Sequence, residues 1–177
     1  MGGVRAYQRL RPPKEQAMST LIVFYSRGGH TRQIATELAA RCGADLEEIR
    51  EARSRDGFWG YCRSALQVLT GALPPILKPS RDPANYDVVM IGTPVWVQRP
   101  APPVRAYLQQ NATSLGQVAY FCTLVGSGDR QTFGEMSRQC GKAPRATLAV
   151  TEAQLPAALH AAQVSDFLAR VNHPARP

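Results

Sequence analysis

The chain lacks the features that mark several common classes of protein. None of its apolar runs approaches the about 20 residues that a membrane-spanning helix requires, which indicates no membrane span. Its 4 cysteines include no Cys-x-x-Cys pair, a pattern typical of reduced thiols in a cytoplasmic protein. We find no carboxylate pair, no Ser-His-Asp order and no metal-ligand cluster, so neither a hydrolase nor a metalloenzyme is indicated.

Acidic residues are also scarce, with 13 Asp and Glu against 21 Lys and Arg and a net charge of +8. Residues 1–17 hold four of the basic residues and one acidic residue, so the remainder carries +5. We expect residues 1–17 to be a disordered or upstream extension, with a functional basic arm as the alternative, and residues 18–173 to form one domain. The other arginines are dispersed without interleaved aromatic residues, which argues against nucleic acid as a partner.

The remainder of the chain alternates between apolar runs and helical periods. The almost continuously apolar runs are typical of strands covered on both faces. Five such units predict an α/β fold with a doubly wound, five-stranded parallel sheet and helices on both faces. Proline clusters at 73–79 and 99–103 indicate connections, since proline cannot sit in a central strand. The expected strands are Leu21–Tyr25, Ala44–Ile49, Tyr86–Gly92, Gln117–Thr123 and Arg145–Thr151.

The first strand leads into a loop suited to an anion. Ser26 ends the apolar run, Gly28 and Gly29 follow, and Thr31 opens a helical pattern. The N–H groups at a helix start have no intrahelical partner, and the helix dipole favours negative charge there. The loop lacks the Gly-Lys-Ser/Thr of a nucleoside-triphosphate loop and the three-glycine spacing of a dinucleotide loop. It therefore predicts a phosphate monoester site.

Ligands of such sheets bind beyond the carboxyl ends of the strands, where the winding direction reverses. The segments that follow the first, third and fourth expected strands should therefore converge. All are rich in Gly, Ser, Thr or Pro, as a cradle made mainly of backbone would be. These segments are Ser26–Thr31, Thr93–Arg99 and Thr123–Thr132.

In this order and at these strand ends, the three segments resemble those of the flavodoxin-like FMN-binding family. The resemblance spans roughly residues 19 to 171 and implies strand order 2-1-3-4-5 and noncovalent FMN. It implies that one loop holds the FMN phosphate, that a second borders the flavin ring and that a third meets its pyrimidine edge. Those loops would use Ser26, Arg27, Gly28, Gly29, His30 and Thr31; Thr93, Pro94, Val95 and Trp96; and Thr123, Gly126, Ser127 and Gly128.

The chain departs from the electron-carrier members of this family in two ways. Those carriers place a second aromatic residue in the loop after the fourth strand, but residues 125–130 contain none. They also surround the ring with acidic residues, whereas this chain offers Arg99 and Arg130 against Asp129. A cation about 6 Å from the ring contributes roughly 3 kcal/mol at an effective dielectric near 20, which favours an anionic reduced ring.

These departures favour an NAD(P)H-dependent FMN reductase that acts on a quinone or similar acceptor. The alternative is a one-electron carrier that docks on redox proteins, and the alternative from another class is a cofactor-free interaction domain. A second subunit closing the open face of the ring would make a homodimer. No side chain is required as a general acid or base, because the flavin supplies the chemistry.

Several residues have two interpretations each. Trp96 stacks on the ring or packs in the core, and His30 serves the phosphate or is a capping or exposed residue. Cys122 is a packed thiol or a redox partner. The aromatic residues of the second helical pattern pack in the core or a subunit contact, or cover substrate; they are Phe58, Trp59 and Tyr61. We expect His160 and His173 to be isolated and exposed.

Overall fold

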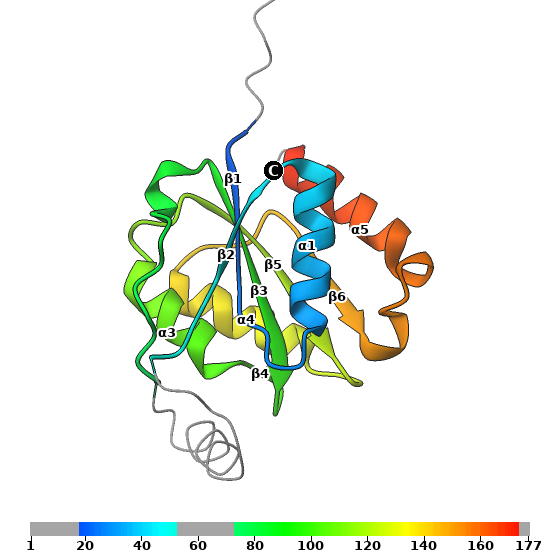
Figure 1. The fold of residues 1–177 in the computed structure, drawn as a ribbon, viewed down its shortest axis with the longest axis horizontal. Helices are drawn as coiled ribbons and strands as arrows, with labels where there is room; N and C mark the ends of the chain where they lie inside the picture. Colours follow the sequence, from blue (N-terminus) through cyan, green and yellow to red (C-terminus); the bar gives the residue numbers. More distant parts are fainter. Residues whose placement is uncertain (1–17, 53–72, 174–177) are drawn as a thin grey trace, which may run out of the picture.

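The computed structural model describes residues 18–52 and 73–173, and a central parallel sheet organises this part of the chain (Figure 1). The sheet order is β2-β1-β3-β5-β6, and a short β4 pairs antiparallel with β3. Without β4, the parallel strands follow the order 2-1-3-4-5, so the predicted fold class is confirmed. The strands are β1 (Thr20–Phe24), β2 (Asp45–Glu48), β3 (Val88–Trp96), β4 (Arg99–Pro100), β5 (Gln117–Leu124) and β6 (Thr147–Thr151).

Helices cover both faces of the sheet (Figure 1). On one face, Ile22 of β1 packs in a core with the helices α1 and α5. On the other, Leu21 and Val23 pack with α3 and α4. Side chains alternate between the faces along each strand, so each apolar run supplies both cores. The helices are α1 (His30–Cys42), α3 (Pro102–Asn111), α4 (Asp129–Cys140) and α5 (Ala157–Asn172), with short 3₁₀ turns η1 (Pro83–Asn85) and η2 (Glu152–Gln154).

The segment from residue 93 to residue 103 differs from the prediction. Residues 93–96 were expected in a loop but continue β3, because Val95 and Trp96 pair with Pro100 and Arg99 of β4. Residues 99–103 were expected as a connection, but they form β4 and the first turn of α3. Prolines fit that first turn because its N–H groups have no intrahelical partner. The third strand thus extends past its neighbours as a hairpin.

The second predicted helical pattern, with Phe58, Trp59 and Tyr61, lies outside the described residues. Within the described ranges, no helix is both long enough and apolar enough to cross a membrane.

Candidate functional site

The ends of β1, β3 and β5 enclose a cavity of about 480 Å³, which we call the strand-end cavity. It lies where the sequence predicted three segments to converge, at the carboxyl edge of the parallel strands. Its walls come from the loop before α1, the end of β3, the end of β5 and the first residue of η2. The lining residues are Ser26, Arg27, Gly28, His30, Thr31, Pro94, Val95, Trp96, Thr123, Leu124, Val125 and Glu152.

One end of the cavity, the helix end, is formed by residues 26–31 at the start of α1. Gly29 begins the helix with φ of 90°, a left-handed conformation that favours glycine, and no side chain caps the helix N-terminus. The Ser26 hydroxyl is buried and finds no hydrogen-bond partner among the described residues. A buried hydroxyl without a partner is costly, so this atom fits a ligand that is not part of the chain. The donor set suits a phosphate group.

The buried Thr31 and Thr123 hydroxyls lie 2.8 Å apart and join the loop before α1 to the end of β5. Either oxygen can donate, so one hydroxyl of the pair keeps a free hydrogen for an acceptor in the cavity. This contact places two predicted site residues from distant segments side by side.

His30 and Glu152 close the same end of the cavity. The His30 Nδ1 lies 3.4 Å from the Glu152 carboxylate, and both side chains are nearly half exposed. Arg27 is exposed at the rim, whereas Arg32 turns away to the Glu48 carboxylate at 2.5 Å. Sequence reasoning missed Glu152. Its position directly after a parallel strand was the available signal, because all such strands end at this edge.

The other end of the cavity, the hairpin end, is formed by the end of β3, just before its turn into β4. The Trp96 ring contacts the Tyr25 ring edge-on, with centroids 5.9 Å apart and an interplanar angle of 86°. The two turn residues, Val97 and Gln98, have φ of 50° and 61°. Such values are typical of a type I′ turn, where Asn-Gly is favoured, and they strain a β-branched valine. Val97 is 76% exposed, so this strained tip faces solvent.

The loop after β5 packs beside this hairpin. Gly128 caps α4 with φ of 115°, and a Cβ built there would lie 2.9 Å from the Gln98 Cα. Only glycine allows this approach. Val125 is 80% exposed at the cavity mouth, in the loop that lacks an aromatic residue.

Not every predicted site residue lines the cavity. Thr93 is fully buried, and its hydroxyl donates to the Pro94 carbonyl and accepts from the Ala101 N–H, each at 2.9 Å. It therefore holds the hairpin in place. Four predicted glycines and serines also lie outside the lining; they are Gly29, Gly126, Ser127 and Gly128. The Cys122 thiol is fully buried away from the lining, and its burial raises its pKa, so its surroundings are those of a packed thiol.

His160 was expected to be exposed, and this prediction is wrong. The residue is fully buried and links α1 to η2, with Nδ1 2.6 Å from the Gln154 carbonyl and Nε2 2.6 Å from the Glu37 carboxylate. Both partners only accept hydrogen bonds, so both ring nitrogens donate when the ring is protonated. Burial lowers the pKa of His160, but these bonds outweigh it and leave the pKa raised. The expectation for His173, at the end of α5, is confirmed because it is exposed.

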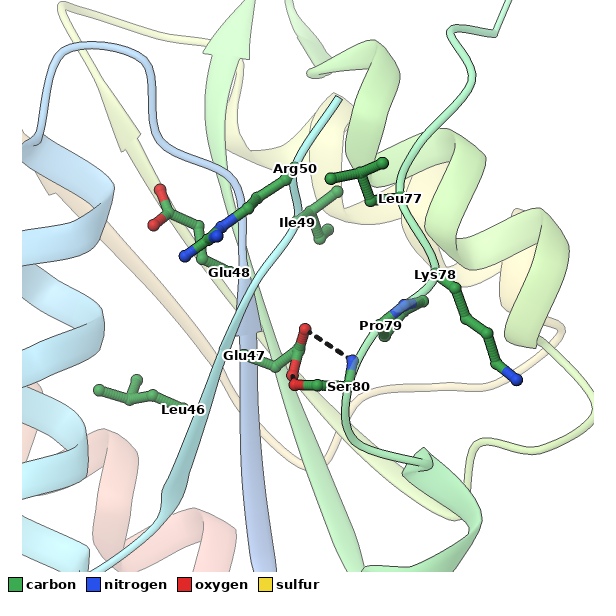
Figure 2. Close-up of a pocket in the computed structure, with 9 residues that line it drawn as sticks. All are labelled: Leu46, Glu47, Glu48, Ile49, Arg50, Leu77, Lys78, Pro79 and Ser80. Carbon is green, nitrogen blue, oxygen red and sulfur yellow. Dashed lines mark hydrogen bonds between the residues drawn. The ribbon is translucent and has the colours of Figure 1, made fainter. Parts of the chain in front are cut away.

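A separate hollow of about 300 Å³ lies between β2 and residues 77–80 (Figure 2). Figure 2 shows Glu47 directed at Ser80, whose N–H and hydroxyl donate to its carboxylate at 3.1 and 2.5 Å. Lys78 is directed away from this carboxylate. Glu47 therefore attaches this segment to the edge strand, and Glu48, the other acid of the hollow, is paired with Arg32. The described part of the chain also contains no group of three or more potential metal ligands.

Comparison with known proteins identifies relatives of this fold. A flavoprotein from Lactobacillus acidophilus, solved in complex with FMN, has 26% sequence identity and a TM-score of 0.66. The match covers 75% of this chain and 93% of the flavoprotein. A protein from Bacteroides eggerthii has 21% identity and a TM-score of 0.69, with 85% and 98% covered. A flavodoxin, WrbA-like protein from Agrobacterium tumefaciens has 17% identity and a TM-score of 0.51, with 88% and 99% covered. No curated protein matches the chain.

A family model described as flavodoxin matches residues 19–149, which include the helix end, the hairpin and the loop after β5. That range covers most of the chain, and the strand order and the convergence of the three segments agree with it. The chain therefore belongs to the flavodoxin family.

Proposed function

We propose that the strand-end cavity binds FMN noncovalently, with the phosphate at the helix end and the flavin ring at the hairpin end. The Ser26 hydroxyl beside the uncapped start of α1 carries this proposal, because it is buried and has no hydrogen-bond partner among the described residues. The FMN complex of the Lactobacillus acidophilus flavoprotein supports the same ligand. Thr31 would donate to the phosphate, and the Trp96 indole would cover one face of the ring.

The proposed activity is reduction of a quinone or similar acceptor by NADH or NADPH. The overall reaction takes a hydride from NAD(P)H and a proton from solvent and converts the quinone into its quinol. FMN, when bound, supplies the ring that accepts and returns the hydride. The chain's residues position that ring, and Arg130, exposed near the start of α4, stabilises negative charge on it. The exposed Val125 leaves one face open to a donor.

The reductase proposal is tested by mixing FMN-loaded protein anaerobically with NADH or NADPH while flavin absorbance is followed. We expect rapid bleaching and recovery of the absorbance when a quinone is added. A folded protein that fails to bind FMN at micromolar concentrations would instead be a cofactor-free interaction domain. The free thiols of Cys42, Cys122 and Cys140 fit the cytoplasmic setting that we propose for this activity.

A one-electron carrier is the second candidate, because the same cavity would also hold the flavin of a protein that docks on another redox protein. It predicts no bleaching by either nucleotide and reduction by dithionite in two resolved one-electron steps. Size exclusion of the FMN-loaded protein at several concentrations tests separately whether a homodimer forms and closes the open face.

A further inference from the structure

A second hollow adjoins the strand-end cavity on the other side of the β3–β4 hairpin. We call it the arginine hollow; its volume is about 380 Å³, within the range of ligand pockets, about 300–1,000 Å³. Val95 and Trp96 line the strand-end cavity, whereas Val97 and Gln98 line the arginine hollow. The two spaces therefore share the hairpin as a common wall. The remaining walls are Arg99 of β4 and residues 131, 134, 135 and 138 of α4.

The charge of the arginine hollow is positive in spite of its one carboxylate. Glu135 is mostly buried and is engaged by Arg105, whose Nε lies 3.0 Å from its Oε1, and by the Gln139 amide at 3.2 Å. Arg99 lies farther away, at 3.9 Å, with its side chain 53% exposed. Because Arg105 neutralises Glu135 at the shorter distance, Arg99 keeps most of its charge available.

Arg138 adds a second available cation to this space. It is exposed, and its Nε donates to the Gly134 carbonyl one turn earlier at 3.3 Å. It makes no ion pair with any residue in the described part of the chain. The hollow floor is open at Gly134, where a built Cβ would meet nothing within 4 Å. Two guanidinium groups with unused donors around an open floor are suited to phosphate oxygens.

We propose that the arginine hollow binds a phosphate group of the nicotinamide dinucleotide while its nicotinamide reaches the flavin ring around the hairpin. This inference rests on the proposed reductase function and deepens it, since it names where the donor is recognised. The phosphate comes from the diphosphate link of either nucleotide or from the 2′-phosphate of NADPH. Gln98 and Gln131 supply further amide donors at the rim.

The test compares Arg99→Gln and Arg138→Gln with Arg170→Gln, a control that removes an exposed arginine of α5 paired with Asp166. Binding of NADP⁺ to the FMN-loaded protein is measured by calorimetry, and flavin reduction is measured with NADH, NADPH and the phosphate-free donor 1-benzyl-1,4-dihydronicotinamide. We expect each hollow variant to weaken NADP⁺ binding about tenfold and to slow flavin reduction by NADPH about tenfold. The control variant should bind NADP⁺ and react with NADPH as the unmodified protein does. Flavin reduction by the phosphate-free donor should be unchanged in every variant. Gly134→Glu, which places a carboxylate on the open floor, should give the same loss without removing an arginine.

If the hollow variants reduce the rate of flavin reduction equally with NADH and NADPH, the hollow binds the diphosphate. If they reduce it with NADPH alone, the hollow binds the 2′-phosphate. The inference is overturned if unmodified protein is reduced by the nucleotides and the hollow variants behave like Arg170→Gln. It is also overturned if the variants slow the phosphate-free donor equally, because the arginines then act on the flavin. Reduction of the unmodified protein by the phosphate-free donor alone would instead overturn the proposed function.

Discussion

The helix end of the strand-end cavity is built mainly from backbone and small hydroxyl side chains, whereas the hairpin end is built from large side chains next to a strained turn. At the helix end, the left-handed Gly29 and the buried Thr31–Thr123 contact set the geometry. At the hairpin end, Val97 is exposed and has an unfavourable φ. The cavity thus combines an uncapped helix start, a geometry that favours anions in general, with a hairpin built from particular side chains. We expect the helix end to determine cofactor affinity and the hairpin end to determine donor and acceptor.

The largest expected effect comes from removing the two hydroxyl donors of the helix end. Ser26→Ala combined with Thr31→Ala should weaken FMN at least tenfold, because a hydrogen bond to a charged group contributes about 1.5–3 kcal/mol. Riboflavin, which lacks the phosphate, should bind as before. Fluorescence titration with both ligands measures this. The matched control is Thr113→Ala with Ser114→Ala, an exposed pair after α3. Equal losses for FMN and riboflavin would contradict the assignment of the two ends.

The buried His160 links α1 to η2 through Glu37 and Gln154, and the stability that this link contributes should depend on pH. The pKa of His160 is raised above its ordinary value of 6.5, so the protonated ring stabilises the fold. That contribution is fully present below pH 6.5 and is lost as pH rises through the folded-state pKa. Unfolding by urea at several pH values should show this decline.

His160→Gln should flatten this pH dependence and lower stability at pH 6 by about 1–3 kcal/mol, since hydrogen bonds to Glu37 and Gln154 are lost. His173→Gln, at the exposed end of α5, is the control and should keep the slope of the unmodified protein. An unchanged slope in His160→Gln would show that the buried ring stays neutral.

A smaller effect is expected from Trp96 at the hairpin end. Trp96→Leu removes a stacking partner worth on the order of 1 kcal/mol, so FMN and riboflavin should both weaken about fivefold. Trp96→Phe keeps an aromatic face and should recover most of this loss. A loss confined to FMN would place the tryptophan near the phosphate and reverse the orientation of the ligand.

The smallest effect concerns the strain of the turn itself. Val97→Asn with Gln98→Gly installs the residues that a type I′ turn favours and should stabilise the protein by about 1 kcal/mol. In a chain of this size, that corresponds to about 3 °C in Tm. Val125→Asn, at another exposed valine, should change stability by less than about 0.5 kcal/mol. A lower Tm in the turn variant would show that the valine makes contacts that outweigh its strain.

The sheet and the helix end were predictable because their signals are local in sequence. An apolar run that ends at Ser26 and leads through Gly28 into a helical pattern indicates a strand, a loop and a helix start from neighbouring residues alone. The convergence of the three segments then followed from the rule that parallel strands end at one edge.

The extended hairpin and the buried histidine were not predictable for the opposite reason. Pairing of β4 depends on a tight turn at Val97 and Gln98, residues that do not favour such a turn. His160 looks isolated because its carboxylate partner lies 123 residues earlier and its other partner is a backbone carbonyl. Both features are produced by tertiary contacts that leave no pattern in nearby residues.

The Thr31–Thr123 contact also has a consequence for when the protein acquires its ligand during biosynthesis. The two residues lie 92 positions apart, and the cavity needs both. A ribosome that adds about 5–20 residues per second needs about 5–18 seconds to synthesise that stretch. Through this interval, α1 is already made while its hydroxyl partner is not. Cofactor capture is therefore a late event in the life of the nascent chain, and a truncated product that stops before β5 would remain colourless.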